Sequence, residues 1–335
     1  MVIGWYVHHH GFGHLARFLA VQPHLRMPVV AFSSLARPSA LDPAVEWVEL
    51  PRDADVVEAA DGTVLDPRES EPTARGVLHW APHDHPGHRA RLATIARDSS
   101  DRPLRALVVD VSAEVVAFAR LLGLRTVAVT QPGTRTDAPH SLAYALADRI
   151  IAPWPHGAVP APGLAAHGDR TVWTGGISRF DGRMPEPADG TRSVLLLGRV
   201  LDTETRIAVT SSLSARGWEV TAVGHDDASR VADPWPSIGR STVVVSAAGQ
   251  NSVADLAASG SRAVVIAQDR PFDEQHATAD ALERWGLARR AGQDVSAPDL
   301  VDIIERAADD EPDWTRWQVS GAAARMAAAV EGVLP

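Results

Sequence analysis

The chain has 335 residues, 45% of them hydrophobic, and a formal net charge of −10 at pH 7. This length favours two domains of ordinary size, and the acidic balance argues against nucleic acid or an anionic membrane as a partner. Cysteine and lysine are absent and all 32 basic residues are arginine, which excludes disulfides, thiolate nucleophiles, Schiff-base lysines and a Walker A loop.

The chain begins directly with a strand-like segment, and no apolar run reaches the roughly 18 residues that span a bilayer. We therefore expect a cytoplasmic protein without stable membrane insertion. Short Val-rich runs predict buried parallel strands in the first half, at 2–7, 29–32, 45–50, 104–109, 126–130 and 149–152. Helical patterns at 113–122 and 140–147 lie between them. This alternation predicts a doubly wound α/β domain over residues 1–178.

The loop after the first strand contains four histidines, His8, His9, His10 and His14, together with Gly11 and Gly13. The glycines permit a tight turn into a helix, which would place His14 at the helix N-terminus as a neutral general base for an acceptor hydroxyl. The alternative is a glycine turn whose histidines are only hydrogen-bonded.

The same loop also fits the minimal dinucleotide fingerprint Gly11-x-Gly13-x-x-Ala16, with Arg37 placed to face a 2′-phosphate. That interpretation predicts an NADP-dependent oxidoreductase.

His79, His83, His85 and His88 form a dense cluster in the long stretch 51–101, which we expect to be irregular. Pro82 and Pro86 interrupt any helix there and no zinc-binding spacing is present, so we predict no metal site. The better prediction is an acceptor-binding surface made of His10, Trp80, His83 and His85, with Trp80 stacking on a sugar or aglycone.

Asp110 ends the predicted strand 104–109 at the edge where ligands bind in open α/β sheets. It either orients a catalytic histidine or, like Ser112, caps the next helix.

The second half repeats the scheme, with predicted strands at 193–197, 219–223, 242–245 and 263–267 and a helix at 203–215. Residues 193–313 therefore form a second predicted α/β domain. Residues 179–192, rich in Pro, Gly and Asp, form the predicted linker, and the Ala-rich segment 314–335 a closing helix.

Residues 246–275 carry the strongest signal for nucleotide binding. Small residues follow a predicted strand and precede a helix, so a diphosphate can approach the backbone and the free N–H groups. Asp255, one turn into the helix, would accept hydrogen bonds from ribose hydroxyls, although Ser252-x-x-Asp255 also fits a capping box. The predicted donor-binding residues here are Ser246, Ala248, Gly249, Gln250, Asn251, Ser252, Asp255, Arg270, Asp273, Glu274 and Gln275.

The loop from Gly11 to His14 and the segment 246–275 resemble the motifs of two-domain GT-B glycosyltransferases, particularly the group that contains the lipid II-forming N-acetylglucosaminyltransferase. The resemblance implies two Rossmann-like domains facing a cleft, with the C-terminal helix crossing back to the first domain. It also places Gly13 and a phosphate-contacting loop, Gly198-Arg199, at the donor. One departure is Asp255, where the family usually has Glu.

The resemblance implies an inverting, metal-independent hexosyl- or N-acetylhexosaminyl-transferase, with His14 as base and Asp110 as its partner. Its co-substrate would be a nucleotide-sugar donor, with no further cofactor. The resemblance implies a UDP-sugar, because enzymes of this group commonly use one. The acceptor would be a small molecule, a glycan or a lipid-linked compound. A UDP-sugar 2-epimerase of the same fold and a noncatalytic sugar-nucleotide sensor stay open as alternatives.

Overall fold

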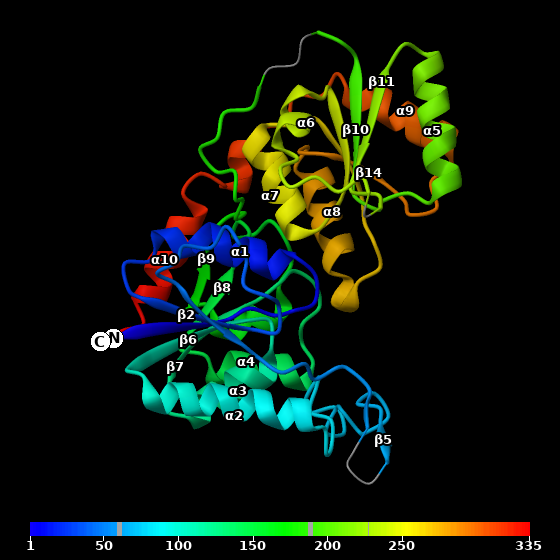
Figure 1. Cartoon of the computed structure of the whole chain (residues 1–335). Helices are drawn as coiled ribbons and strands as arrows, with labels where there is room; N and C mark the ends of the chain where they lie inside the picture. The colour runs from blue at the N-terminus through cyan, green and yellow to red at the C-terminus, as the bar shows by residue number, and fades with distance from the viewer. Residues whose placement is uncertain (59–61, 187–189, 227) are drawn as a thin grey trace.

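Two parallel sheets organise the chain (Figure 1). The computed structural model describes residues 1–58, 62–186, 190–226 and 228–335. Residues 187–189 of the predicted linker and 59–61 of the stretch 51–101 lie outside the described residues. Within the described part, no helix combines the length and apolarity needed to cross a membrane.

The first sheet has seven strands in the order β3-β2-β1-β6-β7-β8-β9, and every neighbouring pair is parallel. Its strands are β1 (Val2–Tyr6), β2 (Val29–Ser33), β3 (Glu46–Glu49), β6 (Leu104–Asp110), β7 (Arg125–Val129), β8 (Arg149–Ala152) and β9 (Thr171–Trp173). The central strands are buried along most of their length because helices cover both faces of the sheet. The order reverses between β1 and β6, so the residues that follow these two strands meet at one crevice.

The second sheet has five parallel strands in the order β11-β10-β12-β13-β14. They are β10 (Ser193–Leu197), β11 (Glu219–Val223), β12 (Val243–Ala247), β13 (Ala263–Ile266) and β14 (Arg289–Ala291). Two short strands, β4 (Val57–Glu58) and β5 (Val64–Leu65), form a separate antiparallel pair. The fold class predicted from the sequence, two doubly wound domains, is confirmed.

The helices are α1 (Gly13–Val21), α2 (Pro86–Asp101), α3 (Ala113–Leu121), α4 (Ala138–Leu146), α5 (Thr203–Ala215), α6 (Trp235–Arg240), α7 (Gln250–Ser259), α8 (Glu274–Arg284), α9 (Ala297–Ala307) and α10 (Ala322–Glu331). The prediction that 51–101 is irregular is wrong for its second part, where α2 lies. Pro86 does not break this helix because it lies in the first turn. The backbone N–H that proline lacks would have no partner within the helix at that position.

The C-terminal segment crosses back to the first domain, as predicted. Figure 1 shows α10 (red) beside α1 (blue), and its residues Met326 and Val330 are buried in one cluster with Ile3 and Trp5 of β1. It is not one continuous helix, however. A 3-10 turn, η4 (Trp314–Trp317), precedes α10, and the left-handed backbone at Gln318 and Gly321 separates them.

Glycine is required where the first domain leads into the linker. Gly175 has a φ of +79°, and a Cβ there would lie 2.2 Å from the carbonyl oxygen of Gln318. The next residue, Gly176, packs against the indole of Trp317 and donates its N–H to the Trp317 carbonyl at 3.1 Å. The crossing between the domains is therefore held by backbone contact with the C-terminal segment.

Candidate active site between the two domains

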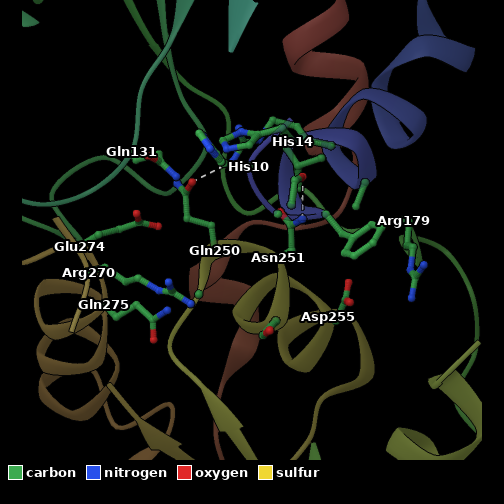
Figure 2. Close-up of a pocket in the computed structure, with 18 of the residues that line it drawn as sticks. His10, His14, Gln131, Arg179, Gln250, Asn251, Asp255, Arg270, Glu274 and Gln275 are labelled. Atoms are coloured by element: carbon green, nitrogen blue, oxygen red, sulfur yellow. Dashed lines mark hydrogen bonds between the residues drawn. The ribbon is translucent and has the colours of Figure 1, made fainter. Parts of the chain in front are cut away.

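A cavity of about 630 Å³ lies between the domains. Most of its lining comes from three loops, which run from β1 to α1, from β12 to α7 and from β13 to α8, and Gln131, Ile177 and Arg179 complete it. Figure 2 shows His10 and His14 on one side and Asp255, Arg270 and Gln275 on the other. The predicted site residues that line it are His10, Gly13, His14, Gly249, Gln250, Asn251, Ser252, Asp255, Arg270, Glu274 and Gln275.

His14 and Asp110 form a buried pair. Asp110, at the end of β6, is 0% exposed, and its Oδ1 accepts a hydrogen bond from His14 Nδ1 at 3.0 Å. Burial alone would raise the pKa of Asp110, but Arg17 and His14 hold it below its usual range. Because a carboxylate only accepts, the proton of a neutral His14 sits on Nδ1 and leaves the Nε2 lone pair available. Ser112, not Asp110, caps α3 by accepting from Val115 N.

Arg17 completes this pair, and the sequence analysis missed it. Its Nη1 donates to both Asp110 oxygens, at 2.7 and 2.9 Å, and its Nη2 donates to Gln250 Oε1 of the second domain at 2.8 Å. Asn251 Nδ2 also donates across the cleft, to the carbonyl of Gly13 at 2.8 Å. A signal was present, because Arg17 follows His14 by three residues and so shares its helix face.

The histidines before Gly11 lie next to this pair. The rings of His8 and His9 stack in parallel at 5.1 Å, and the His8 ring lies 5.6 Å from that of His14. Burial lowers the pKa of His8 to about 3 and that of His9 to about 4. Both rings are therefore neutral near pH 7.

On the donor side, α7 starts at Gln250 with Gly249 as its N-cap and no side-chain capping bond. The capping-box alternative for Ser252 and Asp255 is therefore wrong, because Ser252 lies inside the helix. The first N–H groups of α7 have no side-chain cap and face the cavity that Gly249 and Gln250 line. Ser246 and Ala248 are buried and shape the loop without lining the cavity.

Asp255 lines the cavity and also contacts the first domain. Its Oδ1 accepts from Ser178 Oγ at 2.6 Å. Burial raises the pKa of Asp255 to about 6, although Ser178 and Arg179 act in the opposite direction. Below about pH 6 this carboxyl is mostly protonated and can donate as well as accept, whereas near pH 7 it is mostly ionised and accepts.

A neighbouring cavity of about 350 Å³ lies at the carboxyl ends of β10, β11 and β12, where Gly198 and Arg199 are found. It shares Arg179, Ser252 and Arg270 with the main cavity. The arginines that line this second cavity are Arg179, Arg199, Arg230 and Arg270. Sequence reasoning missed Arg179 and Arg230, which lie outside any recognisable motif.

Other predicted donor residues lie differently. Asp273 is exposed, has a left-handed backbone with φ 55°, and lines neither cavity. Gln275 is mostly buried, and its Oε1 accepts from Gln268 N at 3.0 Å, so it braces the loop that carries Arg270.

The predicted acceptor residues separate into two groups. His10 and Trp80 line a further cavity in the first domain. His83 is 72% exposed and faces Glu71, and His85 is buried as the N-cap of α2, accepting from His88 N at 3.2 Å. Neither His83 nor His85 lines that cavity.

One cluster among the described residues, His79, Asp137 and His140, has its potential metal-ligand atoms within 4.8 Å of one another. Arg135 Nη1 lies 3.1 Å from His140 Nε2, and because arginine only donates, that nitrogen accepts. His140 therefore carries its proton on Nδ1 and donates it to Asp137. Hydrogen bonds account for this arrangement without a metal ion.

Comparison with solved structures identifies the fold. The chain is similar to the glycotransferase of kitacinnamycin, with a TM-score of 0.68 and 15% identity over 100% of this chain and 99% of that one. It is similar to MurG of Acinetobacter baumannii, with a TM-score of 0.63 and 15% identity over 99% of each chain. It is also similar to the spinosyn rhamnosyltransferase SpnG in complex with thymidine diphosphate, with a TM-score of 0.59 and 18% identity over 100% of this chain and 97% of that one. No family model and no curated protein sequence matches. The chain therefore has the GT-B fold.

Proposed function

We propose that this protein is a glycosyltransferase that moves a sugar from a nucleoside diphosphate donor to an acceptor hydroxyl, with inversion and without a metal ion. The observation that carries the proposal is the position of His14, which Asp110 holds by a hydrogen bond and which borders the same cavity as the uncapped N-terminus of α7 and Arg270. A base and a diphosphate site thus line one cavity.

The reaction fits a single displacement. The acceptor oxygen attacks the anomeric carbon while the bond from that carbon to the diphosphate breaks, and the nucleoside diphosphate leaves with the bonding electrons. His14 Nε2 takes the hydroxyl proton, and Asp110 stabilises the resulting imidazolium. Arg179 and Arg270 border the cavity and, with the first N–H groups of α7, would stabilise the departing charge.

The donor experiment is calorimetric titration of the whole protein with UDP, thymidine diphosphate and NADPH. We propose UDP as the nucleotide on the sequence resemblance. Thymidine diphosphate is the competitor because the similar SpnG structure contains it. Binding of NADPH alone would overturn the proposal. Arg37 already donates to the carbonyls of Val45 and Asp42, at 2.6 and 2.8 Å, which leaves the 2′-phosphate interpretation without support.

The catalytic experiment compares turnover of the native protein and of His14→Ala with a sugar donor that binds. We expect a loss of about a hundred- to ten-thousand-fold in kcat with nearly unchanged donor affinity, since a general base contributes mainly to the transition state. Activity should survive EDTA. Near-normal kcat in His14→Ala would place the base elsewhere, and a new nucleotide sugar formed without acceptor would identify an epimerase.

A further inference from the structure

Asp255 is the carboxylate that the interdomain cavity offers to a hydroxyl group. Two carboxylates line that cavity among the described residues, and the other one, Glu274, lies 3.6 Å from the guanidinium of Arg135. Asp255 follows Gln250, the first residue of α7, by five positions, which corresponds to about 7.5 Å along the helix axis. A nucleoside diphosphate with its phosphates at the N-terminus of α7 would therefore place the sugar ring of its nucleoside beside Asp255.

Ser178 holds one oxygen of this carboxylate. Its Oγ accepts a hydrogen bond from Phe180 N at 3.0 Å, so the single hydroxyl hydrogen is left for Asp255 Oδ1, which lies 2.6 Å away. Ser178 is 4% exposed, and it follows Gly176, whose N–H is bonded to the Trp317 carbonyl at 3.1 Å. The hydroxyl of Ser178 is therefore a fixed donor rather than a mobile surface group.

The other oxygen of Asp255 is left for a ligand. Oδ2 accepts no hydrogen bond from any residue that the structure describes, and Asp255 lines the cavity. The pKa of Asp255 is about 6, so the carboxyl is mostly ionised at pH 7.5 and acts as an acceptor. A hydroxyl group of a bound molecule can therefore donate to Oδ2, while Oδ1 is turned toward the buried Ser178.

This arrangement suits one hydroxyl rather than two neighbouring ones. A carboxylate that binds two adjacent donors places one oxygen against each of them. Ribose offers such a pair in its 2′- and 3′-hydroxyls, whereas 2′-deoxyribose keeps only the 3′-hydroxyl. Aspartate is one methylene group shorter than glutamate, so Asp255 cannot reach past Ser178 to present both oxygens to the pair. The 3′-hydroxyl is the nearer of the two, because C3′ is bonded to C4′, which carries the 5′-phosphate chain.

We propose that Asp255 recognises a single hydroxyl of the donor's nucleoside, the 3′-hydroxyl, so that the site accepts 2′-deoxynucleoside diphosphates as well as ribonucleoside diphosphates. Ser178 determines this specificity, because it occupies the oxygen that would otherwise accept from the 2′-hydroxyl. The proposal rests on the transfer function proposed above and concerns its donor. A donor built on thymidine is then as acceptable at this position as a donor built on uridine.

The test is calorimetric titration of the full chain at pH 7.5 with three nucleotides that share one base and one charge: UDP, 2′-deoxy-UDP and 3′-deoxy-UDP. We expect UDP and 2′-deoxy-UDP to bind within about threefold of each other. We expect 3′-deoxy-UDP to bind at least about tenfold more weakly, since it lacks a hydrogen bond to a charged group. A tenfold preference for UDP over 2′-deoxy-UDP would overturn the proposal, and so would equal binding of all three. The corresponding thymine, adenine and guanine nucleotides extend the comparison to other bases.

Variants assign the recognition to its residues. Ser178→Ala releases Asp255 Oδ1, so it should bind UDP at least about fivefold more tightly than 2′-deoxy-UDP, a preference that the native protein lacks. In Asp255→Ala all three nucleotides should bind within about threefold of one another. Ser259→Ala is the matched control, because it removes a serine hydroxyl from the other end of α7, which lines neither cavity on the donor side. Circular dichroism checks folding. An equal loss of affinity for all three nucleotides in folded Ser178→Ala would leave Ser178 a structural role and contradict its assignment.

Failure of this proposal is distinguishable from failure of the proposed function. Sugar transfer together with a strong preference for UDP over 2′-deoxy-UDP would reject recognition of a single hydroxyl and leave the transferase intact. Nucleotide binding that depends on Asp255 and on the 3′-hydroxyl, without any sugar transfer, would reject the transferase and leave the nucleoside site. Absence of binding by every nucleoside diphosphate would reject both.

Discussion

At the scale of single residues, the Asp110 carboxylate accepts hydrogen bonds from two groups: the permanently charged guanidinium of Arg17 and the imidazole of His14. Arg17 lowers the pKa of Asp110, so without the guanidinium charge the Asp110 carboxylate would take up a proton at higher pH and stop accepting from His14 Nδ1. His8 and Gln250 also lie near this region without adding charge, and Glu274, whose pKa burial raises, interacts with Arg17 and His14. Arg17 is thus a positioning residue that keeps Asp110 ionised.

We expect the acid limb of the kcat/KM profile to move to higher pH by about one unit in Arg17→Gln, which keeps a hydrogen-bond donor but removes the charge. Arg17→Lys is the control and should leave the limb in place. A uniform loss of kcat/KM at every pH, with no movement of the limb, would reduce Arg17 to a structural role.

Asp255 gives a prediction about stability. Its pKa is about 6 when folded and near 3.8 when unfolded. Because the folded pKa is the higher one, the free energy of unfolding is greatest below the unfolded pKa and falls as the pH rises from about 4 to about 6. Above that range, the buried, ionised carboxylate lowers the free energy of unfolding by at most about 3 kcal/mol. Asp255→Asn keeps an acceptor for Ser178 Oγ, so it should raise Tm at pH 8 and change it little at pH 4, as measured by calorimetry. A lower Tm at pH 8 would contradict the assigned burial cost.

At the scale of elements, α2 depends on a cap that comes from the predicted acceptor cluster. His85 Nδ1 accepts from His88 N, and His85 Nε2 lies 2.9 Å from the Asp55 carbonyl, to which it donates. His85→Ala should therefore lower the free energy of unfolding by about 1 to 3 kcal/mol, while His83→Ala, at an exposed position, should change it by about 0.5 kcal/mol or less. Urea denaturation of the two variants measures this difference. A raised acceptor KM with normal stability in His85→Ala would restore its predicted acceptor role.

The same elements show what the sequence can predict. Strands 149–152, 193–197 and 219–223 and helix 203–215 have the expected bounds. Short runs rich in Val, Ile and Leu mark the strands, and Asp202 caps the helix by a local rule. Helix α2 was missed because it buries only Arg91 and Ile95, which gives no apolar stripe.

The residues of the candidate site also fall into a predictable group and an unpredictable group. The proximity of His14 and Asp110 follows from two adjacent strand ends, which sequence order reveals. The contact of Arg17 with Gln250, and the positions of Arg179 and Arg230, depend on how the two domains meet, and no local pattern encodes that.

At the scale of the whole molecule, one loop of the second domain anchors it to the first. Phe272, with a left-handed φ of 66°, packs its ring edge-on against His140 at 4.8 Å and under the guanidinium of Arg135 at 4.8 Å. Its carbonyl oxygen accepts from Thr134 N at 2.9 Å and presses against Gly133, where a Cβ would lie only 1.9 Å from that oxygen. Backbone meets backbone here, so a side chain at residue 133 can be accommodated only if the domains separate.

Gly133→Ala should therefore open the cleft, since it adds this clash to the strain of a φ of +102°. We expect a larger radius of gyration by small-angle X-ray scattering and a lower kcat, because His14 and the donor loop would no longer line the same cavity. Nucleotide affinity should change little, since α7 and the arginines at the ends of β10 and β13 stay together in the second domain. Gly168→Ala is the matched control, because a Cβ there meets nothing within 4 Å and its φ is not positive. If Gly133→Ala kept the native radius and turnover, the Phe272 contact would not hold the domains together, and closure would depend on the remaining interdomain contacts, among them those of Gln250, Asn251 and Asp255.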